Sequence, residues 1–171
     1  KVVARKNKVV ENLVNGIHYL LEKSQVRLIN GTAELSDNNT VIAKTDSGTV
    51  TIQANHIIIA SGSKSATLKI AGIDNNNVLT SDQVLDMESL PESLVIIGGG
   101  VIGMEFAFIF SAFGVKVAVV EYLEECLMAC DHDVCAQIGA VAAEKGIKLY
   151  KGSQVEEILP AEDGGCIVAF S

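Results

Sequence analysis

A short apolar run that ends in a glycine-rich turn constrains this chain more than any other feature. Residues 94–97 are all aliphatic, glycines follow at once, and Gly103 completes the pattern G-x-G-x-x-G. The pattern predicts a buried parallel strand, a sharp turn and a helix that begins near Val101. Gly98 permits the turn, Gly100 leaves room for a pyrophosphate, and Gly103 lets the helix pack close to the strand. The free N–H groups at the start of that helix favour a bound phosphate.

An acidic residue follows the second strand of this unit. Glu121 directly follows the predicted strand 115–120. A carboxylate at this position can accept hydrogen bonds from both hydroxyls of a ribose. A 2′-phosphate would be repelled there, so the sequence predicts NAD(H) rather than NADP(H). The alternative interpretation is a generic glycine-rich turn between a strand and a helix.

Composition and charge exclude several classes of function. Hydrophobic residues make up 49% of the chain, and 13 Lys and Arg against 21 Asp and Glu give a net charge of −8. This predicts a folded protein and disfavours nucleic acid and membrane surfaces as partners. Residues 94–120 could pass for a membrane span, but their glycines and polar residues favour strand, helix and strand. Because no secretory signal is present, we expect a cytoplasmic protein, and the missing initial Met indicates a piece of a longer one.

The remaining pattern predicts an α/β fold in which a helix and a β-meander precede the glycine-rich unit. An amphipathic helix is expected over 5–23 and a polar connector over 63–77. The other expected elements are strands at 26–29, 40–44, 49–53 and 56–60, a short helix at 81–88, a helix from Asp131 to about Lys145, a strand at 147–150 and a hairpin of 154–159 with 166–170. We expect a parallel sheet whose strand order reverses beside Gly98.

This order of elements resembles the middle of the flavoprotein pyridine nucleotide-disulfide oxidoreductases, and most closely their dihydrolipoamide dehydrogenase branch. Residues 60–63, Ala-Ser-Gly-Ser, resemble the family's Ala-Thr-Gly-Ser flavin motif, and residues 30–33 resemble its Gly-x-Gly/Ala strand. The resemblance implies a partial FAD-binding domain over 1–72 and a truncated, Rossmann-type NAD-binding domain over 73–171. The FAD contacts that it implies are Ala33, Ser61, Gly62 and Ser63. The NAD contacts that it implies are Gly98, Gly99, Gly100, Val101, Ile102, Gly103, Met104, Glu105, Glu121 and Val155.

Three of these NAD positions carry specific expectations. By resemblance, Glu105 lies near the nicotinamide ring and positions it, and Val101 gates the nicotinamide pocket. The alternative for Glu105 is a buried carboxylate that a lysine or a backbone donor satisfies. Val155 matches a position on the adenine side, and core packing explains it equally well.

The chain also departs from the family. It lacks the flavin-binding G-x-G-x-x-G, the redox Cys-x4-Cys of the flavin domain and the C-terminal His-x4-Glu pair. We therefore expect an internal fragment that has no catalytic residue and does not reduce disulfides by itself. For the parent enzyme, the resemblance implies electron transfer from dihydrolipoamide through a disulfide and FAD to NAD+, in a homodimer that can belong to a 2-oxo acid dehydrogenase complex. The alternatives are an NADH oxidase, a coenzyme-A disulfide reductase, a mercuric reductase or a non-catalytic NAD-binding module.

Three cysteines follow the glycine-rich unit. Cys130 and Cys135 have the spacing Cys-x4-Cys, but they lie after the NAD-type unit, so we do not interpret them as the redox pair. Together with Cys126 and His132 they match no zinc-site spacing, and no metal site is predicted. We interpret all four cysteines of the chain as free and as small apolar residues, whose acidic neighbours keep the thiol pKa values high and the thiols unreactive.

Overall fold

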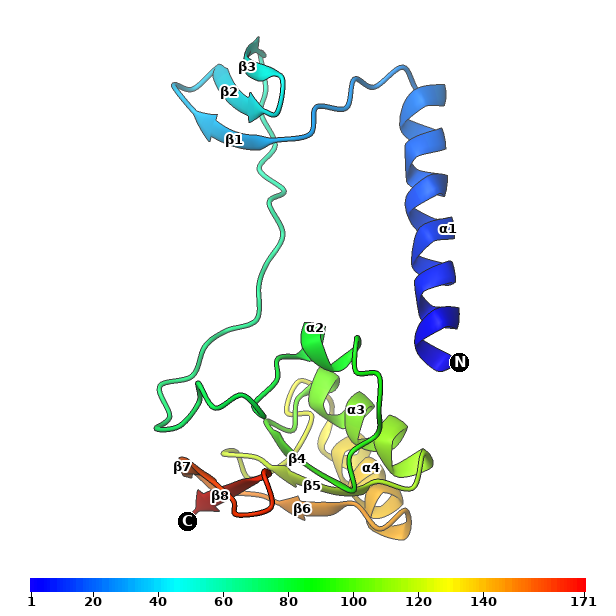
Figure 1. The fold of residues 1–171 in the computed structure, drawn as a ribbon, viewed down its shortest axis with the longest axis vertical. Helices are drawn as coiled ribbons and strands as arrows, with labels where there is room; N and C mark the ends of the chain where they lie inside the picture. The colour runs from blue at the N-terminus through cyan, green and yellow to red at the C-terminus, as the bar shows by residue number, and fades with distance from the viewer. The chain divides into compact units, whose positions relative to one another are not determined.

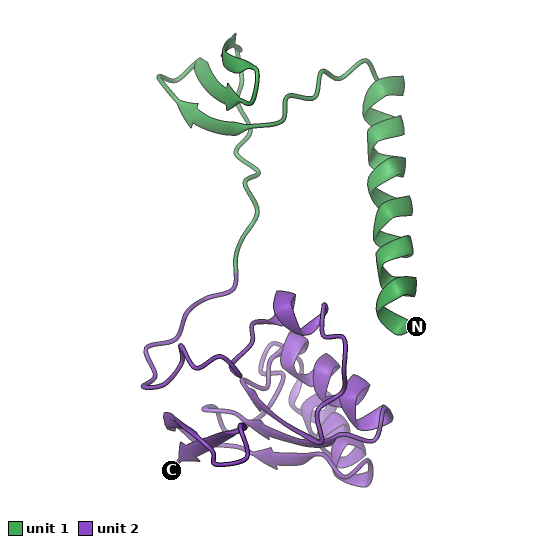
Figure 2. Ribbon diagram, in the orientation of Figure 1, with its two compact units in different colours: residues 1–64 green, residues 65–171 purple.

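The computed structural model describes residues 1–171 (Figure 1). The chain divides into two compact units, Lys1–Lys64 and Ser65–Ser171 (Figure 2). The connector after residue 64 belongs to the second unit because Ala71 accepts a hydrogen bond from the N–H of Ile158 at 2.8 Å. None of the helices is long and apolar enough to cross a membrane.

The first unit opens with the long helix α1 (Val2–Lys23), which confirms the predicted amphipathic helix and begins slightly earlier. Its apolar stripe is exposed: Leu13, Ile17 and Leu20 keep 65%, 56% and 60% of their surface accessible. No residue of α1 is buried. The helical spacing of its apolar residues therefore predicts its conformation but not a packed partner.

A three-stranded antiparallel meander completes the first unit, with β1 (Thr32–Leu35), β2 (Thr40–Thr45) and β3 (Gly48–Gln53) adjacent in that order. The central strand places Ala43 between Ala33 of β1 and Val50 of β3. Ala43 is 5% exposed and is the buried residue of this sheet. The hairpin between β2 and β3 is the predicted one.

Two predicted strands of this unit are wrong. Residues 26–29 and 56–60 form no strand, and Ile58 and Ile59 are 89% and 73% exposed. Each segment is apolar enough for a buried strand, but no strand of the chain pairs with either. A strand needs partners for its backbone N–H and C=O groups, and apolar side chains do not supply them.

The second unit is built on a parallel sheet in the order β4-β5-β6. Its strands and helices alternate along the chain as β4 (Ser93–Ile97), α3 (Val101–Ala112), β5 (Lys116–Val120), α4 (His132–Glu144) and β6 (Lys148–Tyr150). This confirms the predicted strand–helix–strand unit and the strand that follows. The predicted reversal of strand order beside Gly98 is not found, because β4 is an edge strand of this sheet.

Both long helices of the second unit contribute to one hydrophobic core with the central strand. Val119 of β5 and Ala107 of α3 are completely buried, as is Ala142 of α4. The residues of β5 in this core, Val117 and Val119, alternate along the strand and therefore lie on the same face of the sheet. The elements on both sides of the glycine-rich turn pack on this core, β4 through the half-buried Leu94 and Ile96 and α3 through buried residues such as Ala107.

Two smaller elements complete the second unit. Helix α2 (Ser81–Val84) is shorter than predicted, and it is closed at its start by a capping box in which the Gln83 side chain accepts the N–H of Thr80 at 2.8 Å. Strands β7 (Val155–Pro160) and β8 (Cys166–Phe170) form the predicted antiparallel hairpin, with a register shift between Val155 and Glu157.

Candidate functional site

The glycine-rich turn has the backbone geometry that its glycines predict. Gly98 follows β4 with φ +104°, a conformation that side-chain-bearing residues rarely adopt. Gly100 is the N-cap of α3. A Cβ on Gly103 would collide with the carbonyl oxygen of Gly98, so the close approach of helix and strand requires a glycine. By contrast, nothing lies within 4 Å of the position that a Cβ of Gly100 would take. The backbone is therefore open to a ligand on that side.

The Glu121 carboxylate lies against this turn. One of its oxygens accepts the backbone N–H of Gly99 at 2.5 Å, and the other accepts the N–H of Leu123 at 2.8 Å. A carboxylate offers about four acceptor positions, so these two bonds fix its orientation and leave acceptor capacity free. The free acceptor positions of the carboxylate can bind a pair of vicinal hydroxyls.

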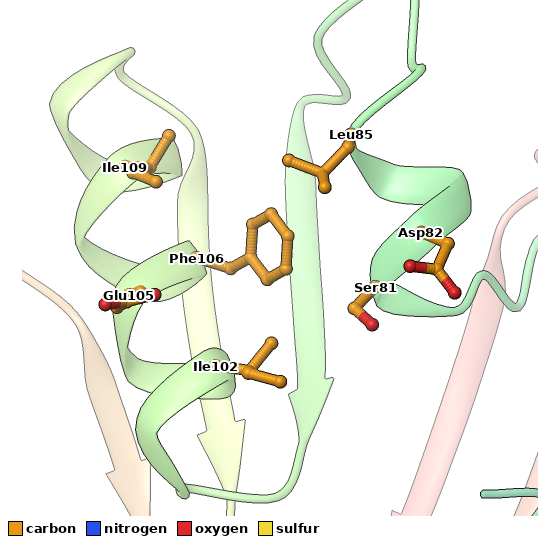
Figure 3. A pocket seen from close by; sticks show the side chains of 7 residues that line it. All are labelled: Ser81, Asp82, Leu85, Ile102, Glu105, Phe106 and Ile109. Carbon is orange, nitrogen blue, oxygen red and sulfur yellow. The ribbon is translucent and has the colours of Figure 1, made fainter. Parts of the chain in front are cut away.

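A cavity of about 290 Å³ lies between the α2 segment and α3. Figure 3 shows Ile102 and Phe106 of α3 pointing towards the α2 segment, from which Leu85 points back, so this side of the cavity is apolar. The remaining lining residues are Ser81, Asp82, Glu105 and Ile109. Glu105 is exposed, and the alternative of a buried, internally satisfied carboxylate is therefore wrong in this structure.

The other predicted NAD residues divide by exposure. Val101 and Ile102, in the first turn of α3, are 55% and 59% exposed. Met104 is 2% exposed, and its backbone N–H donates to the carbonyl of Gly100 at 2.9 Å. Its side chain therefore packs in the core. Val155 is half-buried in the β7–β8 hairpin, where it pairs with Phe170.

The predicted flavin residues lie in the first unit. Ala33 is exposed on β1, and Ser61, Gly62 and Ser63 are exposed in a segment without regular structure. Gly62 has φ +72°, which favours glycine at that position. All four of these residues are thus exposed on the first unit.

Sequence reasoning missed one support of the glycine-rich turn. The N–H of Leu127 donates to the carbonyl of Gly99 at 2.9 Å, and Leu127 adopts a left-handed φ of 60°. The Cys126 sulfur would lie 2.5 Å from a Cβ on Gly99, so this loop fits only a glycine there. The sequence carries no signal for this contact, because a left-handed leucine has no characteristic pattern.

Two cysteines of the second unit, Cys126 and Cys135, have raised pKa values, as the sequence predicts. Burial, followed by the charge of Glu121, raises the pKa of Cys126 above its ordinary value. Burial, followed by the charge of Glu125, raises the pKa of Cys135. All four cysteines are free thiols. The structure contains no group of three potential metal ligands.

Known proteins with similar sequences point to one family. Residues 1–169 match the family model described as pyridine nucleotide-disulphide oxidoreductase. A dihydrolipoyl dehydrogenase of Acholeplasma laidlawii is 33% identical over 162 residues, which cover 92% of this chain and 47% of the relative. A dihydrolipoyl dehydrogenase of Mycobacterium bovis is 35% identical over 168 residues, which cover 98% of this chain and 35% of the relative.

Solved structures give the same result. LpdA from Mycobacterium tuberculosis matches 99% of this chain and 38% of its own, with a TM-score of 0.88 at 27% identity. The HOCl-induced flavoprotein disulfide reductase RclA from Escherichia coli matches 97% of this chain and 40% of its own, with a TM-score of 0.83 at 29% identity. The chain spans between a third and a half of the length of these relatives. It belongs to the pyridine nucleotide-disulfide oxidoreductase family.

Proposed function

We propose that the second unit binds NAD(H) as the nicotinamide-nucleotide portion of a flavoprotein of the dihydrolipoyl dehydrogenase type. The observation that carries this proposal is the hydrogen bond from the N–H of Gly99 to the Glu121 carboxylate. This bond lies in the turn that directly precedes α3. A ribose acceptor and a phosphate-binding helix start thus lie on the same turn.

The residues fit the parts of the dinucleotide in order. The backbone N–H groups in the first turn of α3 lack helical partners, and a pyrophosphate at this helix start would accept hydrogen bonds from them. Gly100 gives that group access, and Glu121 accepts the adenosine ribose hydroxyls. The nicotinamide end reaches the cavity beside Ile102 and Glu105, and Val155 contributes on the adenine side.

In the complete enzyme, this unit supports the last step of an electron relay. When bound, NAD+ would supply hydride-acceptor chemistry at the end of a relay from dihydrolipoamide through a disulfide and FAD. The residues of this chain hold and orient the nicotinamide, and Ala33, Ser61, Gly62 and Ser63 contribute part of the flavin site. We extend the proposal to a cytoplasmic homodimer, with membership of a 2-oxo acid dehydrogenase complex.

A titration with NADH tests the proposal directly. We expect weak but saturable binding, followed by the fluorescence of the reduced nicotinamide. Gly100→Leu places a side chain in the open space in front of the turn, so it should abolish binding while the chain stays folded. Gly139→Ala, on α4 and with nothing within 4 Å, is the matched control and should bind as the natural chain does. Unchanged binding by Gly100→Leu would contradict the assignment.

The flavin part is tested by colour and activity. Because the chain contains one G-x-G-x-x-G turn and we assign it to NAD, we expect a colourless protein with no NADH-driven disulfide reductase activity. Bound FAD in the purified protein would overturn the proposed division between the two cofactors. Turnover of lipoamide that depends on Cys130 would overturn the assignment of the redox centre to another part of the enzyme.

A further inference from the structure

Two cysteines flank the N-cap of α4. Asp131 is the N-cap of this helix, so Cys130 directly precedes the cap and Cys135 is the fourth helical residue. Apolar side chains at these two helix positions often pack against each other across the first helical turn. In the structure, the sulfur of Cys135 lies 3.7 Å from the carbonyl oxygen of Cys130. The two thiols thus share one turn.

The two thiols differ in accessibility. Cys130 is exposed, whereas Cys135 is 8% exposed, and both are free. Burial and the Glu125 charge raise the pKa of Cys135, which disfavours its thiolate. A reagent in solution therefore meets Cys130 first, and Cys135 is placed to react only with a group already attached at Cys130.

We propose that Cys130 and Cys135, contrary to the expectation from the sequence that the thiols are unreactive, form a thiol–disulfide exchange site that reacts with low-molecular-weight disulfides. The Cys130 thiolate attacks one sulfur of the reagent, forms a mixed disulfide and releases the first reagent thiolate. The Cys135 thiol then gives its proton to the released reagent thiolate, and its sulfur attacks the Cys130 sulfur, closes the intramolecular disulfide and releases the second thiolate. The two protein thiols lose two protons and two electrons, and the reagent is reduced to two thiols.

This site is connected to the glycine-rich turn through Leu127. The carbonyl of Leu127 accepts the S–H of Cys135 at 3.3 Å and the N–H of Cys130 at 2.7 Å. The N–H of the same residue holds the carbonyl of Gly99. A disulfide has no S–H to donate, so oxidation removes one of the bonds that hold Leu127. We infer that oxidation weakens NADH binding, an inference that rests on the proposed function.

Mass spectrometry of the 171-residue chain tests the exchange site. After treatment of the reduced protein with oxidised glutathione, we expect a loss of two hydrogen atoms and a peptide map that joins Cys130 to Cys135. Cys135→Ser should instead retain one glutathione on Cys130, and Cys130→Ser should form no internal disulfide. Cys166→Ser, on β8, is the matched control and should behave as the natural chain does. A disulfide through Cys126 or Cys166, or a lasting glutathione adduct on the natural chain, would overturn the proposal.

An NADH titration of the two redox forms tests the connection to the turn. We expect the oxidised form to bind NADH about threefold more weakly, the effect of losing one weak hydrogen bond. Equal affinities would overturn the connection to Leu127, although the mass measurement would still decide the exchange site. Absence of NADH binding in the reduced form would count against the proposed function and would not bear on the disulfide.

Discussion

Glu121 is oriented before any ligand arrives. Its bonds to the N–H groups of Gly99 and Leu123 hold the carboxylate against the turn, so a ribose would meet acceptors that need no rearrangement. The same fixed charge would oppose a 2′-phosphate. A choice between NADH and NADPH can thus reside in one side chain.

Replacing this acid should change the preferred dinucleotide. We expect the natural chain to bind NADH at least about tenfold more tightly than NADPH. Repulsion between the Glu121 carboxylate and the 2′-phosphate of NADPH weakens binding by about 1–3 kcal/mol. Glu121→Arg should shift the preference towards NADPH, and Glu156→Gln, an exposed acid on β7, should leave it unchanged. Paired titrations with the two reduced dinucleotides measure the ratio. A ratio near one in the natural chain would count against the role of Glu121.

The raised pKa of Cys126 predicts that the free energy of unfolding falls at alkaline pH. Its pKa is raised in the folded chain by burial and by Glu121, whereas the unfolded chain keeps an ordinary thiol pKa. The contribution of the Cys126 thiol to the free energy of unfolding is therefore complete below the ordinary thiol pKa. It is lost as the pH rises through the pKa of this thiol in the folded chain. Urea unfolding at several pH values should show this decline, and Cys126→Ala should reduce its slope. An unchanged slope in the variant would show that other groups cause the decline.

At the scale of elements, the packing of α3 on β4 depends on Gly103. A Cβ there would collide with the Gly98 carbonyl and would lie 3.3 Å from the Ile96 side chain. We expect Gly103→Ala to lower the free energy of unfolding by about 1–3 kcal/mol, because backbone atoms have to move. Gly139→Ala, on the open side of α4, should raise it by about 0.5–1 kcal/mol through helix propensity. Chemical denaturation of both variants measures the contrast, and equal effects would contradict the packing argument.

Local patterns predicted the elements that are stabilised by their neighbours in sequence. The unit from β4 to β5 was predictable because its strand, turn and helix pack against one another within a short stretch of chain. The segments at 26–29 and 56–60 were not, because a strand exists only where another strand pairs with it. Likewise, the motif predicted the position of Glu121 beside the turn, but not the support from Leu127, which depends on the path of a loop.

For the whole molecule, the two units differ in how much of their surface is buried. The second unit contains a continuous core around Val119 and Ala107, whereas Ala43 is the buried residue of the first. Local stability follows such burial. The family match covers both units. The difference in buried core between them therefore does not reflect membership of different families.

This difference predicts separate unfolding of the two units. We expect the amides of β5 to exchange with solvent at least about a hundredfold more slowly than those of β2, because a small sheet with little core opens easily. Hydrogen exchange followed by mass spectrometry of peptides measures both strands in one experiment. Val119→Ala should accelerate exchange throughout β4–β6 and leave β1–β3 unchanged, while Ala43→Ser should do the reverse. Parallel changes in both sheets would show that the two units unfold as one.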